Sequence, residues 1–99
     1  MLYTIICHDR ENSLTARKEK RAEHRGRIQA LQAAGRLLVA GPFPAVDATN
    51  PEAAGYTGSL IVAEFPSLQE AEDWAAADPY ISNGVYDSVD VKPFVNVFS

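Results

Sequence analysis

Apolar and polar residues follow two different periods along this chain. Apolar residues at three- and four-residue spacing predict a long helix from about residue 13 to residue 34 and a second from residue 68 to about residue 78. Runs rich in β-branched and aromatic residues predict four strands, at residues 1–8, 36–40, 58–65 and 86–98. The resulting β-α-β-β-α-β order is that of the ferredoxin-like α+β sandwich, in which both helices cover one face of a four-stranded antiparallel sheet.

Capping residues and helix breakers set the element boundaries. Ser67 and Glu70 form a capping box ahead of the second helix. Pro79 ends that helix, because the residue before a proline avoids helical backbone angles. The second strand is expected to stop at Gly41-Pro42. Residues 43–57 contain prolines and a glycine with no clear period, so we expect a packed loop at a dimer contact or a pocket wall.

Both faces of the predicted sheet are apolar. The first strand shows this most clearly, because two alternating sets share it: Tyr3, Ile5 and Cys7 on one face, and Leu2, Thr4 and Ile6 on the other. A sheet with two apolar faces is buried on both sides. The two helices cover only one face, so we predict a homodimer in which a second copy packs sheet against sheet.

Length and composition narrow the class of protein. The 99 residues form one domain, and a net charge of −4 argues against nucleic-acid binding. No apolar run approaches the ~18 residues of a membrane span, and residues 2–6 are too short for a signal-peptide core, so a soluble, cytoplasmic protein is expected. The single cysteine, Cys7, excludes an intramolecular disulfide and is predicted to be an inert packing thiol.

Positive charge is concentrated in the first predicted helix. Six of the nine Lys and Arg residues lie between positions 17 and 27. This cluster is compatible with a solvated helix face and also with a patch that attracts an anion at the mouth of a site. The second interpretation applies to residues that face inward, so Arg17 and Arg21 are candidates for binding an anionic group of a substrate.

A histidine and an aspartate lie on the inward faces of the two helices. Positions 14, 17, 21, 24, 28 and 31 share one helix face, and the apolar end of that face must meet the sheet, so His24 points inward. The apolar stripe of the second helix ends at Asp78, where a nearby histidine compensates the unfavourable helix dipole. A His24–Asp78 pair suits general acid–base catalysis. The alternatives are a buried histidine bonded to a backbone carbonyl and a simple Asp-Pro helix stop.

Two further residues, Ser59 and His8, carry side chains that suit a site. Ser59 opens the third strand and either supplies a hydroxyl to the same site or is an ordinary strand-edge serine. His8 ends the first strand, but two histidines without ligand spacing give only a weak indication of a metal site with His24 and Asp78. No nucleotide-binding glycine loop or cofactor motif is present, so neither a metal nor a cofactor is expected.

Several motifs follow one another along the chain: Arg21-x-x-His24 and residues 35–42, 44–47, 54–59, 77–80, 84–86 and 91–94. In these motifs and their order, the chain resembles the YciI-like proteins of the YCII-related family along essentially its whole length. The resemblance implies a ferredoxin-like fold that dimerises as an α+β barrel, with an active site built on His24 and Asp78. The family is similar to muconolactone-isomerase-type barrels, and some relatives are dehydrochlorinases of small chlorinated hydroxyquinones.

Two functions from different classes fit these observations. The first is a small dimeric enzyme for isomerisation, elimination or lyase chemistry, with His24 as general base and acid, Asp78 holding its tautomer, and Ser59, Arg17 and Arg21 binding substrate. The second is a non-catalytic module that uses the same pocket to bind a small molecule or a partner.

Overall fold

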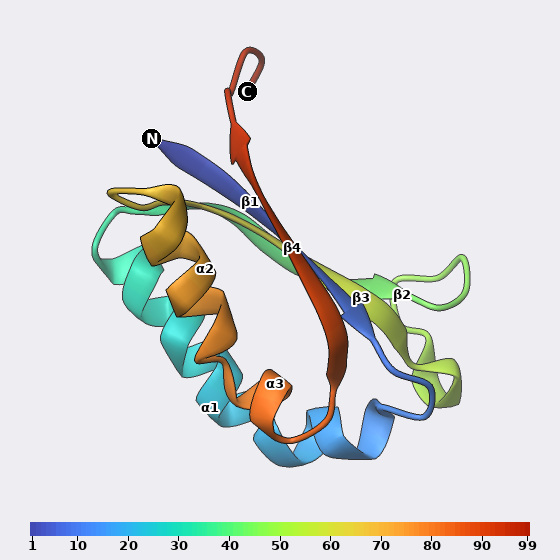
Figure 1. Ribbon diagram of the computed structural model, residues 1–99. Helices are drawn as coiled ribbons and strands as arrows, with labels where there is room; N and C mark the ends of the chain where they lie inside the picture. Colours follow the sequence, from blue (N-terminus) through green and yellow to red (C-terminus); the bar gives the residue numbers. More distant parts are fainter.

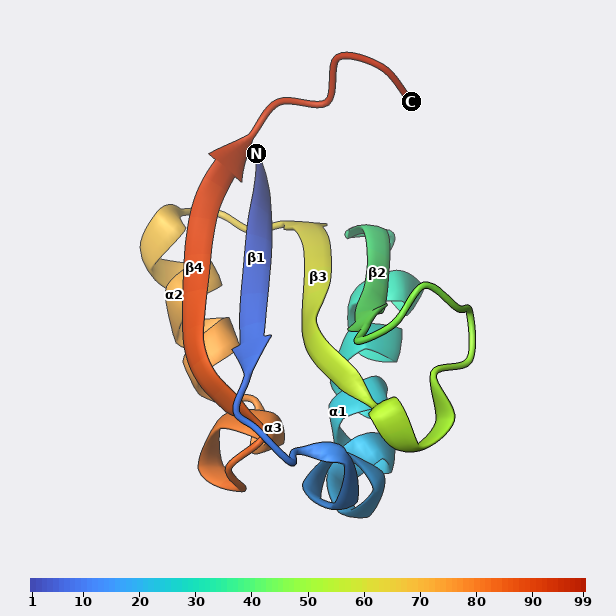
Figure 2. The same ribbon diagram turned by 90° about the vertical axis from the view of Figure 1, so that its right-hand side faces the viewer.

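The computed structural model describes residues 1–99 as a twisted sheet with its helices on one side (Figure 1). The elements follow the order β1 Leu2–Asp9, α1 Leu14–Ala33, β2 Leu37–Pro44, a 3₁₀ turn at Glu52–Ala54, β3 Tyr56–Glu64, α2 Leu68–Ala76, α3 Pro79–Ser82 and β4 Tyr86–Phe94. The sheet order is β2-β3-β1-β4, and every neighbouring pair is antiparallel (Figure 2). The predicted ferredoxin-like α+β class is confirmed.

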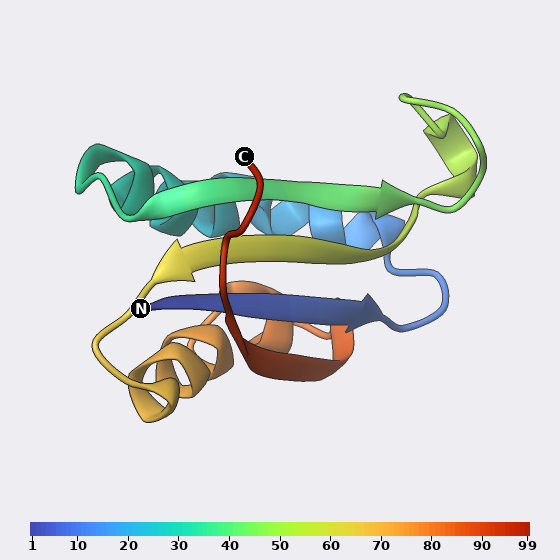
Figure 3. The ribbon, with the colours of Figure 1, turned by 90° about the horizontal axis from the view of Figure 1, so that it is seen from above.

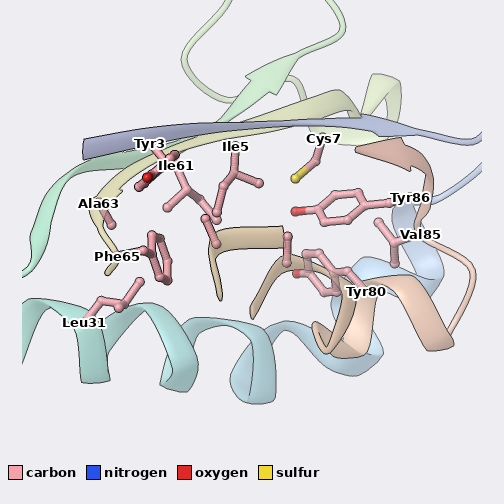
Figure 4. Packing of buried hydrophobic residues seen from close by; sticks show 12 residues of the cluster. Tyr3, Ile5, Cys7, Leu31, Ile61, Ala63, Phe65, Tyr80, Val85 and Tyr86 are labelled. Atoms are coloured by element: carbon pink, nitrogen blue, oxygen red, sulfur yellow. The ribbon is translucent and has the colours of Figure 1, made fainter. Parts of the chain in front are cut away.

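The core lies between the sheet and the helical layer. Figure 3 shows α1 under the β2–β3 side of the sheet and α2 under the β1–β4 side. Ile5 and Ile61 point from adjacent strands toward the helical layer, to which Leu31 of α1 belongs (Figure 4). Ala71 of α2 is a member of the same buried cluster. At the other end of the core, Tyr80, Val85 and Tyr86 close the layer below Cys7.

The second strand continues through Gly41-Pro42 to Pro44, so the predicted stop at Gly41 is wrong. β2 is an edge strand, and proline is tolerated there because its missing N–H is not needed on the open side. The loop that follows is therefore shorter than predicted, and a hydrogen bond from the Ala45 N–H to the Gly55 carbonyl closes it over 2.9 Å.

The fourth strand ends at Phe94, four residues before the predicted end. Phe94 pairs with Leu2, the first residue of β1, so the chain beyond it has no strand to bond. Val95 and Val97 are 72% and 73% exposed. The last residues rise from β4 on the side of the sheet away from the helices (Figure 1).

Asp78 does not lie inside the second helix. α2 ends at Ala76, and Asp78 is the N-cap of the four-residue helix α3. Its backbone is extended, with φ −65° and ψ 133°, as expected for a residue that precedes proline. No helix is both long enough and apolar enough to cross a membrane.

Candidate active site

His24 of α1 and Asp78 at the start of α3 are in direct contact. His24 Nδ1 lies 2.8 Å from Asp78 Oδ2 and 3.0 Å from Oδ1. Both residues are buried, with 7% and 3% of their surface exposed. A carboxylate oxygen accepts, so Nδ1 carries the hydrogen of this contact, and in the neutral imidazole Nε2 then has the lone pair. The contact expected from the two helix faces is present.

Asp78 is fixed by its own turn. Pro79 holds the backbone extended at Asp78, and Oδ1 accepts a hydrogen bond from the Tyr80 N–H over 2.9 Å. This is an N-cap interaction, which favours a carboxylate at the positive end of a helix. The sequence-based expectation placed Asp78 at the unfavourable end of α2, whereas the proline turns it into the favourable start of α3.

Arg27 approaches Asp78 on the carboxylate oxygen nearest His24. Its Nη1 lies 3.5 Å from Asp78 Oδ2, and its Nη2 donates to the Trp74 carbonyl over 2.7 Å. The guanidinium lies over the Trp74 ring, 4.3 Å from the centroid. Burial lowers the pKa of Arg27, and the Asp78 charge opposes this shift.

Two tyrosines hold the imidazole ring in place. The Tyr80 ring stacks on His24, with centroids 4.0 Å apart and an interplanar angle of 8°, and Tyr86 meets it edge-on at 6.2 Å. The Tyr80 hydroxyl donates to the Arg17 carbonyl over 3.2 Å, and burial raises the pKa of this phenol. With Nδ1 bonded and one ring face stacked on Tyr80, Nε2 is the ring nitrogen without a partner in the chain.

A half-open cavity of about 550 Å³ lies beside His24, between α1 and strands β2 and β3. Its apolar wall includes Ile28, Leu37 and Ile61. No acidic residue lines it, and its polar and aromatic wall comprises Arg17, Arg21, His24, Arg25, Gln29, Gln32, Tyr56, Ser59 and Tyr80. Four of the predicted site residues therefore share one cavity, and the fifth, Asp78, bonds to His24 without lining it.

Arg17 is buried in a network that the sequence analysis missed. Its Nε and Nη2 donate to the two carboxylate oxygens of Asp9 over 2.6 and 2.9 Å. Nη2 also donates to the Gly58 carbonyl and to Ser59 Oγ, over 3.0 and 2.9 Å. Burial works to lower the pKa of Arg17, but the Asp9 carboxylate outweighs it and raises that pKa. Nε and Nη2 are thus used within the fold.

Ser59 accepts hydrogen bonds from two directions. Besides Arg17, the Tyr86 hydroxyl donates to Ser59 Oγ over 3.0 Å. Burial raises the pKa of Tyr86 strongly, so this phenol stays protonated. The sequence pattern did not indicate Tyr86 as a site residue, because an aromatic residue at the start of a strand is expected to be part of the hydrophobic core.

The remaining two candidates differ in exposure and position. Arg21 is exposed, lines the cavity and has no carboxylate partner. His8 is exposed and bonds to Asp90 over 3.1 Å, across the β1–β4 pair. The alternation of β1 turns it away from the core residue Cys7, so His8 does not join His24 and Asp78.

Proteins of known family share this sequence closely. The YCII-related domain matches residues 1–95. The chain is 54% identical over 98 residues to Protein YciI of Escherichia coli O6:H1 and 52% identical over 98 residues to an uncharacterized protein of Haemophilus influenzae. Both alignments cover 99% of this chain and 100% of the relative.

A solved structure shares the fold. The 5-chloro-2-hydroxyhydroquinone dehydrochlorinase of Burkholderia phenoliruptrix AC1100, in complex with 2,5-dihydroxybenzoquinone, is similar with a TM-score of 0.83 and 28% identity. The similarity covers 96% of this chain and 94% of that one. Together with the family match over nearly the full length, these relatives establish that the chain belongs to the YCII-related family.

Proposed function

We propose that this protein is a small-molecule enzyme that moves a proton through His24, in isomerisation, elimination or lyase chemistry. One observation carries the proposal: His24 lines the cavity, its Nδ1 is bonded to buried Asp78, and its Nε2 has no partner in the chain. A base needs a free lone pair within reach of substrate, and an orienting partner on its other nitrogen. This geometry meets both needs without a metal or cofactor.

The reaction uses His24 twice. Nε2 first removes a proton from the bound substrate, and the ring becomes an imidazolium. Asp78 stabilises that charge through Nδ1, and the parallel Tyr80 ring face attracts the cation. The imidazolium then returns the proton to a second substrate atom, which completes an isomerisation, or the leaving group departs with its electron pair, which completes an elimination.

The solved relative supports the elimination branch. It is named as a dehydrochlorinase of a chlorinated hydroxyhydroquinone, and its bound molecule is a planar dihydroxyquinone. A cavity of about 550 Å³ with an apolar wall and several polar groups is large enough for a ligand of that size. We propose the same general class, a small ring or carbonyl compound, for this chain.

We propose that Arg21 attracts an anionic group of the substrate. Arg21 lines the cavity and has no acidic partner. Arg17, in contrast, donates hydrogen bonds from Nε and Nη2 to Asp9, Gly58 and Ser59. An unpaired guanidinium at a cavity without carboxylates favours an anion. Ser59 contacts a polar substrate group from the strand side.

The experiment substitutes each member of the His24–Asp78 pair. His24→Gln should lower the rate of chloride release from 5-chloro-2-hydroxyhydroquinone, or of deuterium uptake by a panel of small carbonyl compounds, at least about 100-fold. Asp78→Asn should reduce the same rate. The asparagine amide can donate as well as accept, so it no longer fixes the hydrogen of the imidazole on Nδ1. Rates come from chloride detection and proton NMR in D₂O.

His8→Gln is the matched control. It removes the other histidine–aspartate contact, on the exposed β1–β4 pair, and should leave the rate unchanged. Activity that survives His24→Gln contradicts the proposal. Saturable binding of these compounds without turnover by the unaltered protein indicates the second function, a non-catalytic binding module.

We also propose that two copies associate through their sheets. The outer face of the sheet, the side away from the helices, carries the apolar residues Leu2, Ile6, Val39, Phe43, Leu60 and Val62. Thr4 also lies on this face, and its hydroxyl is buried without a hydrogen-bond partner. The exposed apolar C-terminal segment rises on the same side (Figure 3). A second copy supplies the cover that the two helices do not.

A further inference from the structure

Ser59 Oγ accepts as many hydrogen bonds as its lone pairs allow. Arg17 Nη2 and the Tyr86 hydroxyl both donate to Oγ, over 2.9 and 3.0 Å. A serine hydroxyl has two lone pairs and one hydrogen, so both acceptor positions are filled. No acceptor within the chain receives the hydrogen of Ser59, and Ser59 lines the cavity.

The direction of these two bonds follows from their chemistry. Arg17 has no acceptor atom, so it must donate. A phenol is a stronger donor than an aliphatic hydroxyl, and the burial that keeps Tyr86 protonated leaves its hydrogen available. Figure 4 shows Tyr86 packed in the core below Cys7, whose thiol is only a weak acceptor for that hydrogen. Ser59 is therefore left as a donor toward the cavity.

The surroundings make this donor suited to a negative oxygen. The Arg17 guanidinium lies directly behind Ser59 Oγ, and no carboxylate lines the cavity. Donation from a cation polarises the hydroxyl and strengthens the bond that it makes next. Donors fixed before reaction, in a site of low dielectric, stabilise charge that develops on a substrate oxygen.

We propose that Ser59 is the oxyanion donor of this site, and that the substrates are compounds with a carbonyl oxygen conjugated to an acidic C–H or O–H. The inference rests on the proposed function and names its substrate class. The carbonyl oxygen accepts from Ser59, and the acidic hydrogen faces His24 Nε2. Tyr86 contacts both residues, and both line the cavity, so donor and base belong to one site.

The step that this arrangement promotes is enolisation. His24 Nε2 takes the proton from the C–H, and that bond's electron pair forms a carbon–carbon double bond. The carbonyl π pair moves onto oxygen, where the negative charge meets the Ser59 hydroxyl. The imidazolium then reprotonates a different carbon, or a leaving group on the neighbouring carbon departs with its bonding pair, so electrons and atoms balance without an oxidant.

Phenolate binding tests the donor without catalysis. 4-Nitrophenolate carries an enolate-like oxygen, and 4-nitroanisole has nearly the same shape without the charge. We expect the wild-type protein to bind the phenolate more tightly than the anisole in calorimetric titrations. Ser59→Ala should weaken phenolate binding at least about tenfold and leave anisole binding unchanged. Ser88→Ala, on exposed strand β4, is the matched control and should change neither.

Tyr86→Phe separates the two possible directions of the Tyr86–Ser59 bond. If Tyr86 donates, the Ser59 hydrogen is already free, and removing the phenol should not increase phenolate affinity. If Ser59 donates instead, Tyr86→Phe frees that hydrogen, phenolate affinity rises, and the inference is overturned. Equal phenolate and anisole affinities in wild type, or a Ser59→Ala protein that folds and binds phenolate as wild type does, overturn it too.

His24→Gln distinguishes this inference from the proposed function. The variant should keep its preference for phenolate, because the donor is on Ser59 and not on the base. Lost turnover with retained phenolate preference supports both proposals. Retained turnover in His24→Gln with a Ser59-dependent preference removes His24 as the base and leaves the oxyanion donor in place.

Discussion

Arg17 and Arg27 belong to the same helix and lie near different carboxylates, and their pKa values shift in opposite directions. Arg17 makes two short bonds to Asp9, and its pKa is raised despite burial. Arg27 stays 3.5 Å from Asp78, and burial lowers its pKa. The short bonds to Asp78 are those of His24 and the Tyr80 N–H. Among these side chains, Asp78 therefore bonds most closely to His24, while Asp9 neutralises the Arg17 cation beside Ser59.

Cys7 is a buried thiol whose titration affects stability. Burial raises the pKa of its thiol from the ordinary 9.0 to about 12. At neutral pH the thiol is protonated and 3% exposed, so it should not react with a thiol reagent until the protein unfolds. Colorimetric thiol titration with and without guanidinium measures this; rapid labelling of the folded protein contradicts it.

The same shift predicts how stability changes in alkali. Above pH 9 the unfolded thiol loses its proton while the buried thiol keeps it until about pH 12. The unfolded state then binds fewer protons, so the free energy of unfolding falls as pH rises, by at most about 1.4 kcal/mol per pH unit from this group. Cys7→Ala should lose less stability than wild type between pH 8 and 11 in guanidinium titrations.

At the scale of elements, the sequence predicted what depends on local pattern. Both helices and the four strands follow from the apolar pattern, and all are present. His24 is buried on the helix face that the pattern selects, whereas Asp78 meets it from the start of α3 and not from the apolar stripe of α2. The strand ends that depend on which strands pair were not predictable from the sequence. The end of β4 is set by where β1 begins, and β2 tolerates Pro42 because it is an edge strand, which sequence order alone does not reveal.

The buried polar contacts divide in the same way. Asp78 and Tyr80 are two residues apart, so their N-cap bond was available from the Asp-Pro pattern. Ser59 reaches Arg17 across 42 residues and Tyr86 across 27, and these pairings exist only once β1, β3 and β4 lie side by side. A site built from three strands and a helix has no local sequence signature.

Gly58 shows how closely two of these strands approach. A Cβ at this position would lie 2.0 Å from the Cys7 carbonyl oxygen of β1, and the Gly58 carbonyl also accepts from Arg17. Gly58→Ala should therefore cost about 3 kcal/mol or more, because backbone has to move. Gly41→Ala on β2, where nothing lies within 4 Å, is the matched control. Equal denaturation midpoints for the two variants would contradict this packing.

At the scale of the whole molecule, one chain leaves much of its apolar surface uncovered. Its accessible surface is 6036 Å², against about 5,500 Å² expected for a compact monomer of this mass. Much of the apolar exposure lies on the edge strand β2 and on the C-terminal segment. Val39 and Phe43 of β2 are 49% and 37% exposed on the outer face, and Phe98 of the C-terminal segment is 94% exposed. The distribution fits a second copy better than a solvated sheet.

Val39→Glu tests this association without disturbing the core. Val39 is half exposed on an edge strand, so a single folded chain accommodates the carboxylate, whereas a sheet-to-sheet interface would bury two unpaired charges. Sedimentation at micromolar concentration should give a dimer for wild type and a monomer for Val39→Glu.

Leu68→Glu makes the same change at a residue that is 39% exposed on helix α2, and should remain dimeric. A monomeric wild type, or a Val39→Glu protein that stays dimeric, rules out an interface on this face. The helix layer would then be the side to examine, because it carries Leu68 and the mouth of the cavity lies against α1.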